Sequence, residues 1–195
     1  MKNFAGKIFK YRSYTPIPFV IVMLLFENAN IWSLVIGFLI ALSGEAFRLW
    51  GVSWAGSETR TTGTVGGTFL IISGPFAHVR NPLYVGNILM YTGLGIMSYA
   101  LFPWLQIAGF LFFSLQYHFI VKEEETYLKK TFGEEYQKYL QNVPGFIPRL
   151  SAYKSGNAEQ PPFNFRAGLR SEKRSLQAFG FVALTILLLW FIGRF

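Results

Sequence analysis

Two polar motifs hold most of the residues in this chain that could do chemistry. The first runs from Gly74 to Gly86 and reads Gly-Pro-Phe-Ala-His-Val-Arg-Asn-Pro-Leu-Tyr-Val-Gly, and the second runs from Glu123 to Pro144. An apolar hairpin separates them, so we expect both motifs on one face of a membrane. Charged and glycine-rich residues at the mouth of a transmembrane bundle suit a polar ligand held beside a lipid-like one, which favours an integral-membrane enzyme.

The first motif has the chemistry of an anion site. Arg80 and Asn81 come just before Pro82, which is typical of the first turn of a helix. Backbone N–H groups of a starting helix, together with a guanidinium, suit a carboxylate or a phosphate. An arginine that snorkels to the membrane interface is the alternative interpretation for Arg80.

The second motif opens with three adjacent carboxylates. Glu123, Glu124 and Glu125 follow an apolar run directly. Adjacent like charges at the edge of the hydrocarbon are unfavourable unless a positive group meets them, and Lys122, Lys129 or a bound cation could supply that charge. Glu123 need not face the same way as its neighbours, so we expect it to be solvated.

Composition indicates the elements that position these motifs. The chain has 195 residues, of which 52% are hydrophobic and 14% are charged, whereas an average soluble domain is nearer a quarter charged. We therefore expect one all-α, polytopic membrane domain over residues 1–195. The absence of cysteine excludes a disulfide, a thiolate metal site and a cysteine nucleophile, and we expect no metal site. Membrane topology explains the net charge of +8 better than a nucleic-acid partner does.

Apolar runs predict about five transmembrane helices, each near the length needed to cross a bilayer. They cover residues 15–29, 31–51, 83–98, 100–121 and 176–193. The first two runs form a hairpin through Glu27–Asn30, and the next two form another through Ser98–Pro103, where Pro103 suits the first turn of the returning helix. Apolar residues at helical spacing predict that a helix over 122–141 continues the fourth span.

Charge predicts the orientation of these spans, with the amino terminus inside and the carboxyl terminus outside. Every Lys and Arg except Arg194 then lies at or near the cytoplasmic side. A signal peptide is the alternative for the first run, but no small-residue cleavage site follows it and Trp32 soon opens another apolar run. The basic amino-terminal tail, loop 52–82 and segment 122–175 would be cytoplasmic, so the polar chemistry is expected there.

Glycines are frequent in and around loop 52–82, which permits close approach to a ligand or merely tight turns. They are Gly51, Gly56, Gly63, Gly66, Gly67 and Gly74.

Beyond the loop-like stretch Ser151–Pro162, Arg166 and Arg170 would share one face of a helix and could hold an anionic headgroup or a cofactor carboxylate, with anchoring to anionic lipid as the alternative. Arg48 is a third candidate for such a group, and its spacing also permits an ion pair with Glu45.

Together the two motifs resemble the isoprenylcysteine carboxyl methyltransferase and phospholipid N-methyltransferase superfamily of membrane enzymes. The resemblance covers residues 44–150, and both motifs occur in order around a helical hairpin. The first is carried by Gly74 to Gly86, and the second by Glu124-Glu125, Leu128, Phe132-Gly133, Tyr136, Tyr139 and Val143-Pro144.

This resemblance implies that S-adenosylmethionine binds at the cytoplasmic mouth and that a lipophilic acceptor enters from the bilayer. The cofactor-binding positions it implies are Gly74, His78, Arg80, Asn81, Pro82, Tyr84, Gly86, Glu124 and Glu125. Arginine suits the cofactor's carboxylate, a glutamate suits its ammonium or ribose hydroxyls, and Tyr84 could stack on adenine or face the sulfonium. A prenylcysteine-like carboxylate, a phospholipid amine and a small thiol or acid all stay open as acceptors.

One position departs from the family pattern, which most often has histidine where this chain has Asn81. Asparagine cannot titrate near neutral pH, and we do not assign His78 as a base, so the catalytic residues are unassigned. We expect His118, near Gln116, to be a packed and hydrogen-bonded residue. A membrane reductase with a nicotinamide cofactor and a non-enzymatic lipid-binding protein are the alternative functions, and the second motif argues against the reductase.

Overall fold

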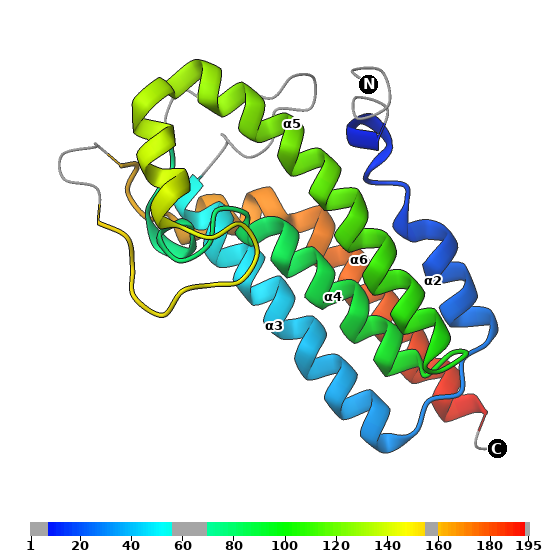
Figure 1. Cartoon of the computed structure of the whole chain (residues 1–195). Helices are drawn as coiled ribbons and strands as arrows, with labels where there is room; N and C mark the ends of the chain where they lie inside the picture. Colours follow the sequence, from blue (N-terminus) through cyan, green and yellow to red (C-terminus); the bar gives the residue numbers. More distant parts are fainter. Residues whose placement is uncertain (1–7, 56–69, 155–159, 194–195) are drawn as a thin grey trace. The chain divides into compact units, whose positions relative to one another are not determined.

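The computed structural model describes residues 8–55, 70–154 and 160–193, and these residues contain helices and no strand. The elements along the chain are α2 (Pro16–Leu25), α3 (Ile31–Ala55), the short 3-10 helix η2 (Gly74–Ala77), α4 (Pro82–Ser98), α5 (Trp104–Asn142) and α6 (Phe165–Ile192) (Figure 1). The predicted all-α fold is confirmed.

Three helices are long and apolar enough to cross a membrane on length and composition, namely α3, α5 and α6. The predicted spans in the region of α2 and α4 correspond to helices of 10 and 17 residues. The chain is therefore a polytopic, all-α membrane protein. The number of five spans and the orientation with the amino terminus inside stay predictions.

Contacts divide the chain into two compact units. The first unit comprises Met1–Glu45, Asn87–Ile120 and Arg174–Phe195, and the second comprises Ala46–Gly86 and Val121–Lys173. Helices α3 to α6 each contribute residues to both units. The single domain predicted over residues 1–195 is not tested by this division.

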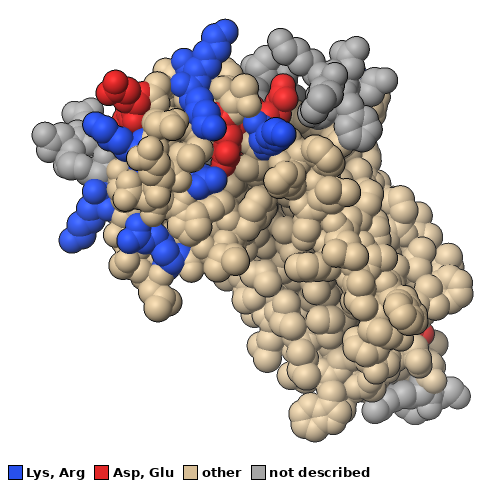
Figure 2. All heavy atoms as spheres, viewed as in Figure 1, with Lys and Arg blue, Asp and Glu red and all other residues tan. Residues whose placement is uncertain are grey.

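Charged residues are concentrated in the second unit. Among the described residues, the charged members of the first unit are Lys10, Arg12, Glu27, Glu45 and Arg174, and all the others belong to the second. Figure 2 shows blue and red spheres crowded over part of the visible face, while a broad area carries almost no charge. A site for a polar ligand is therefore best sought within the second unit.

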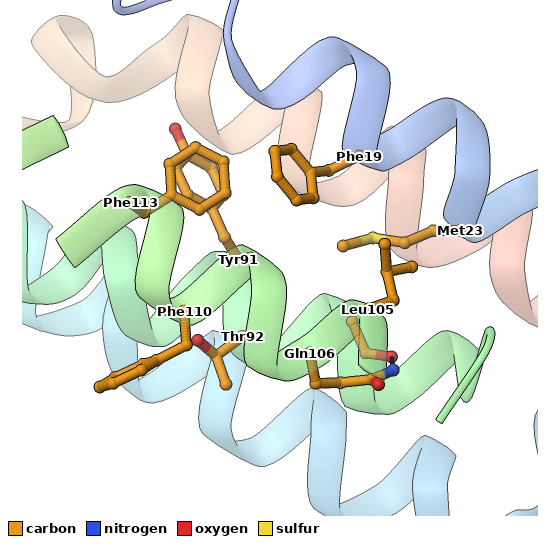
Figure 3. A pocket seen from close by; sticks show the side chains of 10 residues that line it. Phe19, Met23, Tyr91, Thr92, Leu105, Gln106, Phe110 and Phe113 are labelled. Atoms are coloured by element: carbon orange, nitrogen blue, oxygen red, sulfur yellow. Dashed lines mark hydrogen bonds between the residues drawn. The ribbon is translucent and has the colours of Figure 1, made fainter. Parts of the chain in front are cut away.

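The predicted hairpin between 83–98 and 100–121 is present in the first unit. Helix α5 begins at Trp104, directly after Pro103, and the Gln106 side chain donates from Nε2 to the carbonyl oxygen of Gly95 at 2.7 Å. A cavity of about 10 Å³ lies beside Gln106, Phe19 and Phe113 (Figure 3). Such a volume holds about one water molecule, so this cavity is too small for a lipophilic ligand.

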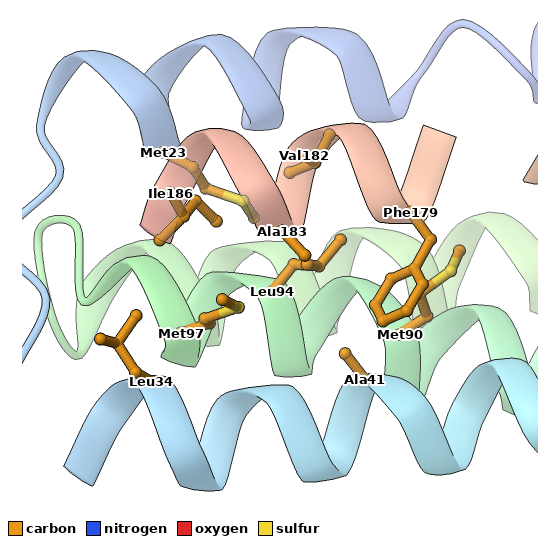
Figure 4. Close-up of a cluster of buried hydrophobic side chains, with 10 residues drawn as sticks. All are labelled: Met23, Leu34, Ala41, Met90, Leu94, Met97, Phe179, Val182, Ala183 and Ile186. Atoms are coloured by element: carbon orange, nitrogen blue, oxygen red, sulfur yellow. The ribbon is translucent and has the colours of Figure 1, made fainter. Parts of the chain in front are cut away.

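The core of the first unit joins α2, α3, α4 and α6 (Figure 4). Its buried members are Met23, Leu34, Ala41, Met90, Leu94, Met97, Phe179, Val182, Ala183 and Ile186. Helices α3 and α4 meet backbone to backbone, because a Cβ atom placed on Gly37 would lie 2.2 Å from the Met97 nitrogen, and one on Gly93 would lie 2.3 Å from the Ala41 nitrogen. Small residues at a helix contact are typical of membrane bundles.

Candidate active site

The outer part of α5 forms one wall of the second unit. The helix continues beyond the fourth predicted span, as expected, but Gly133 breaks it with φ 52° and ψ −123°. Residues other than glycine rarely adopt a positive φ, so a glycine suits the kink at this position. Past the kink, Tyr136 and Tyr139 are buried with Leu70 and Ile72. Burial raises the pKa of both phenols, and the Tyr139 hydroxyl donates to the Phe76 carbonyl at 2.7 Å.

The loop after α5 runs back along the first motif and holds it by backbone hydrogen bonds. The Arg80 N–H donates to the Pro144 carbonyl at 2.9 Å, and the Arg149 N–H donates to the His78 carbonyl at 3.0 Å. The side chain of Gln160 adds two bonds, because Oε1 accepts from the Ile72 N–H and Nε2 donates to the Leu70 carbonyl. The two motifs thus share one framework, although residues 87–122 separate them in sequence.

His78 and Asn81 both hold this loop in place. The His78 Nδ1 atom lies 2.9 Å from the Arg149 carbonyl oxygen, and since a carbonyl only accepts, Nδ1 is the donor in this hydrogen bond. The Asn81 side chain donates from Nδ2 to the Gly145 carbonyl at 3.0 Å. Asn81 therefore keeps a hydrogen-bond donor at this position without a titratable group.

Arg80 connects the first motif to both ends of the second. Its Nε and Nη2 atoms donate to Glu125 Oε1 at 3.0 and 2.7 Å. Its Nη1 atom donates to the carbonyls of Leu140 and Val143, which end the helix without intrahelical partners. Four of the five N–H donors of the guanidinium are therefore engaged.

The positive group that meets Glu125 is Arg80, whereas the sequence predicts Lys122, Lys129 or a bound cation beside the three glutamates. Both lysines are exposed. The planar guanidinium fork can reach a carboxylate and two carbonyls at once, whereas a lysine ammonium is a compact, strongly hydrated charge. The Arg80 and Glu125 side chains are only 15% and 19% exposed, a partly buried position that favours the arginine.

Tyr84 and Glu124 complete the group. The Tyr84 hydroxyl donates to Glu124 Oε1 at 2.6 Å, and Glu124 is partly buried while Glu123 is exposed, as predicted. We call Arg80, Tyr84, Glu124 and Glu125 the motif cluster. It brings two carboxylates, one guanidinium and one aromatic ring together, so its formal charge is negative and its chemistry suits a cationic ligand.

The other predicted positions of the first motif have packing roles in this structure. Gly74 has φ 59°, and a Cβ atom there would lie 2.1 Å from Trp54 Cδ1, so only glycine fits. Pro82 and Gly86 are buried at the start of α4. Of the loop glycines, Gly56, Gly63, Gly66 and Gly67 lie outside the described residues.

The three arginines predicted to hold a headgroup are divided between two environments. Arg48 pairs through Nη2 with Glu172 Oε2 at 2.5 Å, and these side chains are 12% and 3% exposed. Arg166 and Arg170 are exposed and lie together on α6, which begins at Phe165 rather than near residue 176. Sequence reasoning missed Glu172, although one acidic residue inside a basic run just before an apolar span is a signal for an internal ion pair.

The prediction that His118 is packed is wrong, because His118 is exposed on α5 whereas Gln116 is buried. Residues two apart on a helix point about 200° apart, so these two side chains cannot both face the bundle.

Comparison with known proteins adds a family to this geometry. A model of the phospholipid methyltransferase family matches residues 32–135. The chain is 32% identical to the cobalt-zinc-cadmium resistance protein CzcN of Cupriavidus metallidurans, over 66% of this chain and 67% of that protein. It is 27% identical to the nickel-cobalt-cadmium resistance protein NccN of Alcaligenes xylosoxydans xylosoxydans, over 66% and 68%.

An enzyme is also among the relatives. The chain is 32% identical to the protein-S-isoprenylcysteine O-methyltransferase of Homo sapiens, over 63% of this chain and 44% of that enzyme. The match therefore spans less than half of the human protein. Since the family model covers more than half of the chain and the apolar helices place it in a membrane, the protein belongs to the phospholipid methyltransferase family and is an integral-membrane methyltransferase.

Proposed function

We propose that this chain transfers a methyl group from S-adenosylmethionine to a lipophilic acceptor at the cytoplasmic face of a membrane, with the cofactor held at the motif cluster. The observation that supports this most is the meeting of both motifs in that cluster, in a chain of a methyltransferase family. The family generally uses this cofactor. A reductase with a nicotinamide cofactor has no comparable support from the family.

The donor set of the motif cluster fits a cofactor that carries a positive charge. S-adenosylmethionine supplies a methyl group on a sulfonium. Glu124 would accept hydrogen bonds from the cofactor's ammonium or ribose hydroxyls, and its carboxylate would attract the sulfonium. The Tyr84 ring beside it would add a cation–π attraction of about 0.5–2 kcal/mol.

Arg80 has a positioning role in this proposal. We expected it to bind the carboxylate of the cofactor, but its guanidinium already donates to Glu125 and to two carbonyls of α5. It would therefore hold Glu125 and the end of α5 in place for the ligand. His78 and Asn81 would stabilise the loop that closes around the same region.

The chemistry proposed for the chain is an in-line displacement, in which positioning and exclusion of water supply most of the acceleration. A carboxylate or thiolate acceptor needs no general base, whereas an amine must reach the site unprotonated. Because Asn81 cannot accept that proton, a prenylcysteine-like carboxylate or a small thiol or acid suits this site more readily than a phospholipid amine. Any of these acceptors would reach it from the membrane.

Calorimetric titration of the detergent-purified protein with S-adenosylhomocysteine tests the cofactor and its site. We expect saturable micromolar binding, and at least tenfold weaker binding for Glu124→Gln, because a charge-assisted contact contributes about 1.5–3 kcal/mol. Glutamine can still accept the Tyr84 hydrogen bond, so the fold should persist. Glu123→Gln is the matched control, since it removes the neighbouring but exposed carboxylate. No binding by the folded natural chain, or equal losses in both variants, would contradict the proposal.

The two metal-resistance relatives favour a second candidate function, a contribution of methyl transfer to tolerance of cobalt, zinc or cadmium ions. Deletion of the gene in its host would then lower the metal concentration that stops growth. The natural gene should restore tolerance, and the Glu124→Gln gene should not. Equal tolerance with and without the gene would exclude this function and leave the cofactor proposal unaffected.

A further inference from the structure

The first turns of α6 have an inner face that is fixed against α3 within the second unit. Asn164 caps the helix, since its Oδ1 accepts from the Ala167 N–H at 2.9 Å, and its own N–H donates to the Ser53 carbonyl at 2.8 Å. A Cβ atom on Gly168 would lie 2.2 Å from Ser53 Oγ. Glu172, one turn on, is paired with Arg48. Gly168 and Glu172 thus mark the face of α6 that meets α3.

The opposite face of the same turns carries a basic stripe, defined as Arg166, Arg170 and Lys173. At about 100° per residue, these three positions fall within about 60° of one another and point away from Gly168 and Glu172. All three side chains are exposed. Within the described ranges, none of them has a hydrogen-bond or ion-pair partner on its side chain.

The position of the basic stripe on its helix is electrostatically unfavourable. Cations near a helix N-terminus oppose the helix dipole, and Arg166 and Arg170 repel each other at a spacing of four residues. The one carboxylate of this segment, Glu172, faces inward and is paired with Arg48. An anion from outside the chain would offset both the unfavourable interaction with the helix dipole and the repulsion between Arg166 and Arg170.

The rest of the same helix face indicates where such an anion comes from. The stripe positions continue along α6 as large apolar side chains that are well exposed, namely Phe181, Leu184, Leu188 and Phe191. Apolar Phe165 and Leu169 flank the stripe and are exposed as well. A face that changes from basic to apolar along one membrane helix is a face that lies against lipid, with its cations at the headgroups.

We propose that the basic stripe binds the headgroup of an anionic phospholipid, separately from the motif cluster. Guanidinium groups bind a phosphate through paired hydrogen bonds, and the lysine adds a third positive charge. The two arginines are four residues apart and so about one helical turn apart on one side. A single headgroup can therefore reach both.

Titration of the detergent-purified protein with a short-chain phosphatidylglycerol, followed by tryptophan fluorescence, tests this site. We expect saturable binding of phosphatidylglycerol and none of the matching phosphatidylcholine. The double variant Arg166→Gln/Arg170→Gln should bind at least tenfold more weakly, since each basic residue contributes to attraction by anionic lipid. The matched control, Lys129→Gln/Lys130→Gln, removes two exposed cations of α5 and should bind as the natural chain does.

The readouts separate this site from the proposed cofactor site and from a site for free phosphate. S-adenosylhomocysteine binding and the melting temperature should be unchanged in the double variant, because both arginines are exposed and point away from α3. Weaker S-adenosylhomocysteine binding would assign the stripe to the cofactor and overturn the lipid site. Displacement by inorganic phosphate at concentrations equal to the lipid, or equal binding of phosphatidylcholine, would overturn it as well.

Discussion

One side chain, Arg80, holds together three parts of the second unit. Arg80 lies just before α4. Its side chain pairs with Glu125 in the middle of α5 and donates to the carbonyls at the end of that helix. A smaller side chain would leave the partly buried Glu125 carboxylate and two carbonyls without these donors. Leaving such a partly buried group unpaired lowers the stability of the fold by more than the net contribution of its hydrogen bond.

We therefore expect Arg80→Ala to lower the stability of the fold as well as ligand binding. The expected loss is about 2–4 kcal/mol, or about 4–16 °C in melting temperature for a chain of this size. Arg149→Ala is the matched control, because Arg149 also donates to a carbonyl at the end of α5, that of Asn142, but in an exposed position. Its melting temperature should fall by less than half as much. Equal shifts in the melting temperatures of the two variants, measured in one detergent, would contradict the proposed role of Arg80 in holding Glu125 and the end of α5 together.

At the scale of residues, motif spacing predicted which side chains would meet but not how they would pair. Arg80, Tyr84, Glu124 and Glu125 were all expected at one site, and the structure brings them together. The bonds from Arg80 to the Leu140 and Val143 carbonyls could not be predicted, because they depend on the turn at Gly133 and on the returning loop. Neither of those features has a signal in charge or hydropathy. Their roles toward a cofactor stay predictions.

At the scale of elements, apolar runs located the helices but not their ends. Helix α3 continues to Ala55 and α6 begins at Phe165, so both extend beyond the predicted spans, and α6 does so through the polar run Arg170–Arg174. Backbone hydrogen bonding continues wherever caps and packing allow, and the Asn164 cap lies twelve residues before the predicted span starts at Leu176. Hydropathy reports where lipid is the solvent, which is a different boundary from the end of a helix.

Helix α2 shows the opposite error. The run 15–29 was predicted as one span, but the helix covers only Pro16–Leu25. Asn30 then accepts hydrogen bonds from the N–H groups of Trp32 and Ser33 at 3.0 Å and starts α3. Because the cap of the following helix needs an extended approach, the last residues of the apolar run are used for the turn.

At the scale of the whole molecule, the uneven distribution of charge is the basis for the predicted orientation in the membrane. Most of the described charged residues belong to the second unit, and that unit holds both motifs. If the positive-inside rule applies, the motif cluster faces the cytoplasm and the turn between α2 and α3 faces the other side.

The chain has no cysteine, so single introduced cysteines can test this orientation without a background signal. Asn28→Cys and Glu123→Cys both replace exposed residues. A maleimide that cannot cross membranes should label Asn28→Cys in intact cells, and should label Glu123→Cys only after the cells are opened. The reverse pattern would place the carboxylates outside and contradict the predicted orientation.

The ion pair between Arg80 and Glu125 also constrains how the chain can change through evolution. Replacing either Arg80 or Glu125 alone leaves a partly buried charge without its partner, so an intermediate sequence with one change is selected against. The two positions should therefore vary together among descendants or not at all. Glu123, an exposed member of the same glutamate run, is free of this constraint and can drift independently.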